Sequence, residues 1–333
     1  MISQRLADFD DEFKSLPDAL TSATIEMYEA IVQKFLPTPT KIYYLFNLRD
    51  ISKIFQGLLR ADKKFIASKP TMIRLWIHEC FRVFADRLND DKDREQFNAI
   101  LAEKLGTHMD VTFHSICQNR VPPTFGDFVN QDEIYEDLVD FDKLKIHMEK
   151  VLKDYNETPG TVPMDLVLFR DAILHITRIV RVIRQPRGNM LLIGIGGSGR
   201  QSLAKLSSFI CNYTVFKIEI AKNYRRGEFR EDLKRLYKQA GVSNRDTTFI
   251  FVDTQAVEES FFEDINNILS SGEVPNLFKT DELEEIKTNM SAELKKEGVD
   301  EDNNQEVYAF LLDRVKKNLH MIVCMSPVGE VFR

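Results

Sequence analysis

The sequence has few cysteines, and their spacing carries no metal or disulfide pattern. Four cysteines occur in 333 residues, at positions 80, 117, 211 and 324, and no two of them form a CxxC pair. Zinc sites and disulfide frameworks both need cysteines at closer or more regular spacing. We therefore expect four reduced thiols packed in a core, as is usual for a cytosolic protein.

Membrane-spanning segments and secretion signals are missing from the sequence as well. No apolar run approaches the roughly 18 residues that a membrane-spanning helix needs. The residues that follow Met1 include Asp8, Asp10, Asp11 and Glu12, where a signal peptide would be basic and then apolar. We expect a soluble, intracellular chain.

The chain also lacks an excess of positive charge. It has 45 Lys and Arg residues against 52 Asp and Glu residues, a net charge of −7 at pH 7. Proteins that hold nucleic acid or anionic lipid over a whole surface carry the opposite sign, so we expect neither as a partner. Most of the negative charge lies in residues 281–302, with nine acidic and three basic side chains. We interpret this segment as a solvated helix or loop, in preference to a site for a basic partner.

The first part of the chain has the apolar spacing of helices. With 43% apolar residues, the chain can bury about two ordinary cores. Apolar side chains recur at helical spacing in three early segments: 24–35, 51–59 and 72–88. Turn residues at 122–123 and 157–160 interrupt the stretch that follows. We predict a helical small subdomain over residues 1–105 and a connecting helical segment over 106–162.

From residue 163 onward, helical and strand patterns alternate. A helix is predicted over residues 166–184, and another from about Gln201. Four strands are predicted, at 189–193, 215–220, 249–252 and 321–325. The first and the last two are short apolar runs, as expected of strands buried on both faces. Alternation of this kind is typical of a parallel sheet with crossover helices. We therefore predict an α/β subdomain over residues 163–333 with a mainly parallel sheet.

The most specific motif is the glycine-rich stretch after the first predicted strand. It consists of Gly194, Ile195, Gly196, Gly197, Ser198 and Gly199. Glycines let the backbone turn sharply enough to aim several N–H groups at one anion, and the helix that follows adds positive charge at its N-terminus. The order of strand, loop and helix therefore predicts a phosphate-binding loop. The alternative is a glycine turn that joins strand to helix without a ligand.

Three residues after the loop depart from the usual G-x-x-x-x-G-K-[ST] pattern. Arg200 stands where lysine is usual, and Gln201 stands where a hydroxyl that binds magnesium is usual. Ser202 supplies a hydroxyl one position late. Arg200 still offers charge for phosphate oxygens, but its planar fork differs from a compact ammonium group. All three remain candidate ligand-binding residues, with Ser202 a candidate magnesium ligand.

A second motif follows about 50 residues downstream, where the apolar run 249–252 ends at Asp253. It resembles a Walker B strand, whose carboxylate faces magnesium across the sheet. Hydrolytic AAA+ proteins have a glutamate next, which acts as the general base, but this chain has Thr254. Glu258 and Glu259 come too late to replace that base simply. Ser326 follows the last predicted strand, where a polar residue senses the terminal phosphate.

Several further stretches, taken in order with these motifs, resemble the dynein heavy chains, and within them the axonemal branch. They are residues 46–57, 74–88, 168–178, 229–234, 264–267 and 271–278. The resemblance covers almost the whole chain. It implies that residues 1–105 form the small lid subdomain of the third AAA module. It also implies that residues 163–333 form the P-loop large subdomain of the fourth AAA module, ending just after the sensor strand.

The resemblance also implies a function. Arg49 matches the position from which a lid subdomain reaches the nucleotide of its own, preceding module. ATP or ADP with Mg²⁺ is the implied cofactor, and the fourth site is suited to holding nucleotide with little or no hydrolysis. The implied partners are the neighbouring AAA modules of the same heavy chain, with other dynein subunits and microtubules reached only through the complete chain. The implied location is the cytoplasmic cytoskeleton of the ciliary axoneme.

Two other functions stay open at this point. The chain is either a structural ring segment with an empty pocket or a free-standing P-loop nucleotidase. A nucleotidase would be expected to have the loop lysine and a glutamate after Asp253, and Arg200 and Thr254 stand in those places.

Overall fold

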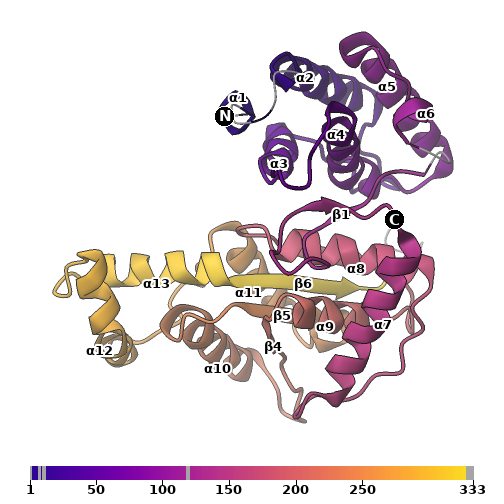
Figure 1. Cartoon of the computed structure of the whole chain (residues 1–333). Coiled ribbons are helices and arrows are strands. Elements are labelled where there is room, and N and C mark those ends of the chain that lie inside the picture. The colour runs from indigo at the N-terminus through magenta and orange to yellow at the C-terminus, as the bar shows by residue number, and fades with distance from the viewer. Residues whose placement is uncertain (1, 7–8, 10–12, 118–120, 328–333) are drawn as a thin grey trace. The chain divides into compact units, whose positions relative to one another are not determined.

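The computed structural model describes residues 2–6, 9, 13–117 and 121–327 and divides into two compact units (Figure 1). Among the described residues, the first unit ends at His147 and the second begins at Met148. The boundary falls inside helix α7 (Phe141–Glu157). The last six residues of the predicted 163–333 subdomain lie outside the described part of the chain. Among the described residues, no helix has the length and hydropathy to cross a membrane.

The first unit is mainly helical. Its helices are α1 (Ile2–Arg5), α2 (Leu16–Lys34), α3 (Leu48–Leu58), α4 (Lys69–Val83), α5 (Asp91–Met109) and α6 (Phe113–Ile116), with a 3₁₀ helix at Ala85–Arg87. The core centres on Trp76 of α4, whose ring N–H donates to the Thr24 hydroxyl of α2 at 2.9 Å. A short antiparallel pair, β1 (Phe125–Gly126) and β2 (Glu136–Asp137), lies in the predicted connecting segment, so that segment is not purely helical.

The second unit is α/β with a parallel four-stranded sheet, which confirms the predicted fold class. The strands are β3 (Met190–Ile193), β4 (Thr214–Phe216), β5 (Thr247–Val252) and β6 (Leu319–Met325), in the order β3-β6-β5-β4. The helices are α8 (Arg170–Ile183), α9 (Arg200–Ile210), α10 (Arg226–Tyr237), α11 (Glu259–Ser270), α12 (Thr280–Glu297) and α13 (Asn304–Asn318). A π-helix at Lys238–Val242 follows α10, and a 3₁₀ helix at Asp253–Gln255 follows β5.

Side chains of β5 build one face of the core by alternation along the strand. Phe249 and Phe251 point to the same face, where they join an aromatic cluster with Phe229 of α10 and Phe261 of α11. The rings of Phe229 and Phe261 are stacked with their centroids 4.3 Å apart. Because all four strands are parallel, their carboxyl ends share one edge of the sheet, and ligands usually bind at that edge.

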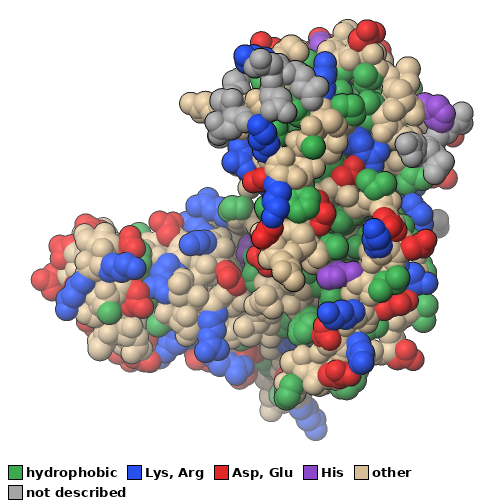
Figure 2. All heavy atoms as spheres, viewed as in Figure 1, with side chains coloured by type: hydrophobic (Ala, Val, Ile, Leu, Met, Phe, Trp, Pro, Cys, Tyr) green, Lys and Arg blue, Asp and Glu red, His purple; other side chains and the backbone are tan. Residues whose placement is uncertain are grey.

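The acidic segment is a solvated helix, as the charge pattern predicts. Helix α12 buries only a narrow stripe consisting of Ile286, Met290 and Leu294. Figure 2 shows acidic and basic side chains intermixed over α12 and α13. These helices lie at the end of the sheet opposite the carboxyl ends of the strands (Figure 1). The four cysteines are free and buried, in agreement with the predicted core thiols.

Three predicted elements differ from the structure. Strand β3 is not buried on both faces: it lies at the edge of the described sheet, with Leu191 47% and Ile193 41% exposed. Helix α8 begins at Arg170 and not at residue 166, because Phe169 is extended and apolar spacing alone does not locate a helix start. Strand β4 ends at Phe216 and not at residue 220. Beyond it the Ile218 carbonyl accepts from the Gln255 side chain at 3.0 Å.

Candidate functional site

The glycine loop joins the carboxyl end of β3 to the first turn of α9. Gly194 N–H donates to the Met325 carbonyl of β6 at 3.2 Å, which ties the start of the loop to the sheet. Gly197 and Gly199 have φ angles of +79° and +78°, a region that residues with a side chain rarely adopt. Gly199 is the residue directly before α9. The backbone therefore favours glycine at these two positions.

The loop borders a cavity of about 310 Å³. Its lining is Gly197, Ser198, Gly199, Arg200, Gln201, Ser202, Lys205, Val252 and Cys324. A Cβ added at Gly196, Gly197 or Gly199 would meet no heavy atom within 4 Å, so space beside the loop backbone is open. Of the predicted loop residues, Gly194, Ile195 and Gly196 lie outside this lining, and the Ile195 side chain is 71% exposed. The structure thus brings the second half of the predicted loop and the three residues after it around one cavity.

Arg200 is held toward the strand ends. Its guanidinium donates to the carbonyl of Met325, the last residue of β6. Its charge also helps to lower the pKa of Asp253. An arginine already engaged with the sheet is less available for phosphate than the lysine it replaces.

Asp253 and Ser326 lie together at the carboxyl edge of the sheet. One carboxylate oxygen, Oδ2, accepts the Ser326 N–H at 2.7 Å, and the other, Oδ1, accepts the Thr254 N–H at 2.8 Å. Hydrogen bonds from Ser326 lower the pKa of Asp253 most, partial burial opposes them, and the Thr254 amide and Arg200 add to the lowering. Asp253 is therefore an ionised carboxylate that holds the ends of β5 and β6 together.

These residues fit a tightly held Mg²⁺ poorly. Magnesium takes six oxygen ligands in near-ideal octahedral geometry, usually from one or two carboxylates, phosphates and water. Both oxygens of Asp253 already accept a backbone amide, and Gln201 offers a side-chain amide in place of the usual hydroxyl. Ser202 lines the cavity one residue beyond that place. Across the described ranges, no three His, Cys, Asp or Glu side chains gather as a metal site.

Among the described residues next to Asp253, none replaces the general base of a hydrolytic site. Thr254 is exposed, and a hydroxyl cannot serve as a base near neutral pH. Glu258 is held by α10: its Oε1 accepts from the Arg225 guanidinium at 3.4 Å, and its Oε2 accepts from the Arg226 N–H at 3.3 Å. Glu259 is the first residue of α11. Neither glutamate is therefore placed as the usual residue directly after the strand carboxylate.

Arg49 belongs to the first unit, where a capping box fixes the start of α3. The Asn47 side chain accepts the Arg49 N–H at 2.9 Å, and the Asp50 carboxylate accepts the Asn47 N–H at 3.0 Å. Asp50 is only 1% exposed and receives two hydrogen bonds from Arg87, at 2.5 and 3.1 Å. The Arg49 side chain is exposed and forms no ion pair with any residue that the structure describes. Its role at the preceding module stays a prediction.

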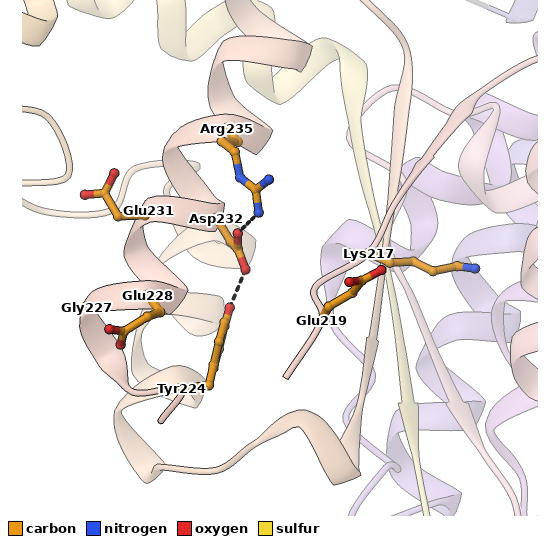
Figure 3. A pocket seen from close by; sticks show the side chains of 8 residues that line it. All are labelled: Lys217, Glu219, Tyr224, Gly227, Glu228, Glu231, Asp232 and Arg235. Atoms are coloured by element: carbon orange, nitrogen blue, oxygen red, sulfur yellow. Dashed lines mark hydrogen bonds and ion pairs between the residues drawn. The ribbon is translucent and has the colours of Figure 1, made fainter. Parts of the chain in front are cut away.

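A second cavity in this unit is larger, about 670 Å³, and lies between the end of β4 and α10 (Figure 3). It is lined by Lys217, Glu219, Tyr224, Gly227, Glu228, Glu231, Asp232 and Arg235. Its central polar groups satisfy one another, because the Tyr224 hydroxyl donates to Asp232 at 2.5 Å and Arg235 pairs with the same carboxylate. Burial and Asp232 raise the pKa of Tyr224. We therefore place the candidate phosphate site at the smaller cavity, where the backbone of the glycine loop borders open space.

One lysine at this site was not recognised from the sequence. Lys205 lines the loop cavity. Lys205 lies four residues after Gln201, so helical spacing from the loop could have identified it.

The parallel sheet, the glycine loop and the carboxylate at the end of β5 together define a P-loop AAA+ domain. Residues 164–333 match the family described as P-loop containing dynein motor region D4, and residues 20–118 match the AAA+ lid domain. The chain belongs to the dynein heavy chain family.

Named relatives agree with this assignment over the whole chain. The chain is 60% identical to dynein axonemal heavy chain 2 of Mus musculus and 59% identical to that of Homo sapiens, each over 333 residues. It is 49% identical over 338 aligned positions to the dynein-1-beta heavy chain, flagellar inner arm I1 complex, of Chlamydomonas reinhardtii. All of this chain is aligned in each comparison, and it spans 8% of the length of each relative.

Proposed function

We propose that the chain is the nucleotide-holding segment of an axonemal dynein heavy chain, and that its glycine loop binds ATP or ADP with little or no hydrolysis. The observation that carries this proposal is the loop itself. Left-handed Gly197 and Gly199 stand at the N-terminus of α9, beside an open cavity at the carboxyl edge of a parallel sheet. Backbone N–H groups and the helix dipole at such a place bind phosphate.

Slow hydrolysis follows from the residues next to Asp253. Loss of a well-placed general base typically lowers a rate by about 10²- to 10⁴-fold. Thr254 cannot act as that base, and Glu258 is engaged with Arg225 and Arg226. Magnesium would be held weakly, since Gln201 lacks a hydroxyl and both oxygens of Asp253 accept amides. The site therefore retains nucleotide and leaves turnover to other modules of the motor.

The match to region D4 supports placing residues 163–333 in the fourth AAA module. The lid match over residues 20–118 supports placing the opening helices in the lid of the module before it, from which Arg49 reaches that module's nucleotide. The names of the relatives, axonemal and flagellar, support a role in microtubule-based ciliary movement within the axoneme. Neighbouring AAA modules are the direct partners, and microtubules are reached only through the complete heavy chain.

The test combines binding and turnover on the purified chain. Calorimetric titration with ADP is expected to give one bound nucleotide per chain, and incubation with ATP is expected to release no more phosphate than buffer alone. Absence of any ADP binding would indicate a structural segment with an empty pocket. Sustained phosphate release would indicate a nucleotidase. Either result would reject the proposal.

A further inference from the structure

Both ends of the glycine loop are bonded to one carbonyl group of the sheet, that of Met325. Gly194, the first residue of the loop, donates its N–H to this carbonyl at 3.2 Å. Arg200, the residue directly after the loop, donates to the same oxygen from its guanidinium. A carbonyl oxygen has two lone pairs, so it can accept both donors. The last residue of β6 therefore closes the loop at both ends.

The other side of the same peptide group is bonded as well. The peptide bond that begins at the Met325 carbonyl ends at the Ser326 N–H, which donates to Oδ2 of Asp253 at 2.7 Å. Arg200 thus lies at the oxygen of this peptide group, and Asp253 lies at its N–H. The oxygen is the negative end of a peptide dipole and the N–H is the positive end, so both charges stabilise it. Hydrogen bonds from Ser326 lower the pKa of Asp253 most, and the Arg200 charge adds to the lowering.

This peptide group lies next to the wall that the sheet contributes to the loop cavity. Val252 of β5 and Cys324 of β6 are paired neighbours in the parallel register, and both line the cavity. Asp253 directly follows Val252, and Met325 directly follows Cys324. The bonds to the peptide group therefore join the two strands at the cavity, and they join both strands to the loop.

We propose that Arg200 and Asp253 are positioning residues, which hold the Met325–Ser326 peptide group between them and through it shape the phosphate site. They stand where a P-loop site usually presents a lysine to phosphate and a carboxylate to magnesium. In this chain both side chains are bonded to the peptide group instead, and Oδ1 of Asp253 also accepts the Thr254 N–H. The consequence for nucleotide rests on the proposed function, whereas the contacts belong to the free chain. Loss of either side chain loosens the site with or without magnesium.

The experiment uses three variants of the complete 333-residue chain: Asp253→Ala, Arg200→Gln and the double variant. ADP is titrated by calorimetry, once with excess magnesium and once with excess chelator. Each single variant is expected to weaken ADP binding by about fivefold or more, and by the same factor in both conditions, because each removes a charge-assisted hydrogen bond from the peptide group. The double variant is expected to bind about as well as the weaker single variant, since both side chains act through one group.

Hydrogen exchange of the free chain tests the contact itself. Asp253→Ala is expected to speed exchange of the Ser326 amide by about tenfold or more, because that amide loses its charged acceptor. Asp253→Asn, which keeps one acceptor oxygen, is expected to have a smaller effect. A residue that served only as a ligand of magnesium or phosphate would leave this exchange unchanged, and that result would overturn the inference.

Asp313→Ala and Arg245→Gln are the matched controls, since each removes the same charge from an exposed residue outside the loop cavity. Both are expected to match wild type in ADP affinity and in Ser326 exchange, and circular dichroism checks that every variant is folded. An Asp253→Ala effect confined to magnesium would identify a metal ligand, and single effects that multiply in the double variant would show that Arg200 acts separately on phosphate. Either result would overturn the inference and leave the proposed function standing. A wild-type chain that binds no ADP would reject the proposed function, and the exchange measurement would still decide whether Asp253 holds the peptide group.

Discussion

The backbone of Gly199 allows a quantitative prediction for Gly199→Ala. Its φ of +78° and ψ of 5° lie in the left-handed region, where an L-residue with a Cβ costs about 1–2 kcal/mol. A Cβ at this position would meet no heavy atom within 4 Å. The variant therefore introduces backbone strain without a clash, and the rest of the fold should tolerate it.

That strain should appear in ligand binding. The flanking loop residues are largely exposed, so the free loop can relax out of the left-handed conformation at little cost to folding. Binding phosphate must then restore the strained conformation. A penalty of about 1–2 kcal/mol corresponds to a 5- to 30-fold loss of ADP affinity. Gly199→Val should bind still more weakly and abolish measurable binding, because a β-branched residue is a stronger outlier at positive φ.

Calorimetry with ADP and thermal unfolding of the free chain measure the two effects separately. Gly298→Ala is the matched control: Gly298 has a φ of +71° and no atom within 4 Å of an added Cβ, but it caps α12 far along the chain from the loop. It should bind ADP as wild type does. A folded Gly199→Ala chain with wild-type affinity would refute the assignment of this loop as the phosphate site.

Three further predictions follow from the site and from the cores. Thr254→Glu alone should leave ATP turnover unchanged, whereas combining it with Arg200→Lys and Gln201→Thr should raise turnover by about 10²- to 10⁴-fold; a large rise from the single variant would contradict our account of the loop. Asp50→Ala should lower the free energy of unfolding in urea by about 3 kcal/mol, because it leaves the paired arginine without its buried carboxylate; an effect below about 1 kcal/mol would show that the pair is not stabilising. Burial lowers the pKa of His320 below its usual 6.5, so the unfolded chain takes up the proton first. Stability is therefore complete above about pH 6.5 and lost as pH falls below it, and His320→Gln should flatten this acid limb of the urea midpoint; an unchanged slope would contradict the assignment.

The parallel sheet and the loop could be predicted because both depend on local order along the chain. Short apolar runs that alternate with helical spacing indicate a parallel sheet, and α9 begins at Arg200, within one residue of the expected position. The edge position of β3 could not be predicted, because an apolar run does not indicate which elements of the fold pack against the two faces of the strand. The exact buried face of α2 could not be predicted either: Ile25 is 42% exposed, while Thr24 and Met27 are buried. Helical spacing fixes the period of a stripe but not its phase.

The contacts of the loop residues depend on strand register, and strand register could not be predicted from the sequence. The pairing of Ile193 with Met325 brings the end of β6 beside the glycine loop, and Arg200 then bonds to a carbonyl 125 residues away. Lys205 lines the loop cavity from the second turn of α9, a position that the loop motif does not include. Spacing and motifs predicted a class of ligand, and the folded chain shows which side chains surround the cavity.

The central claim is that the glycine loop retains nucleotide without turning it over. The most direct measurement mixes the chain with radiolabelled ATP, removes free nucleotide rapidly, and follows both the bound label and the released phosphate over time. Our account predicts close to one retained nucleotide per chain and phosphate release no faster than in buffer. A chain that retains no label, or one that releases phosphate steadily, would contradict it.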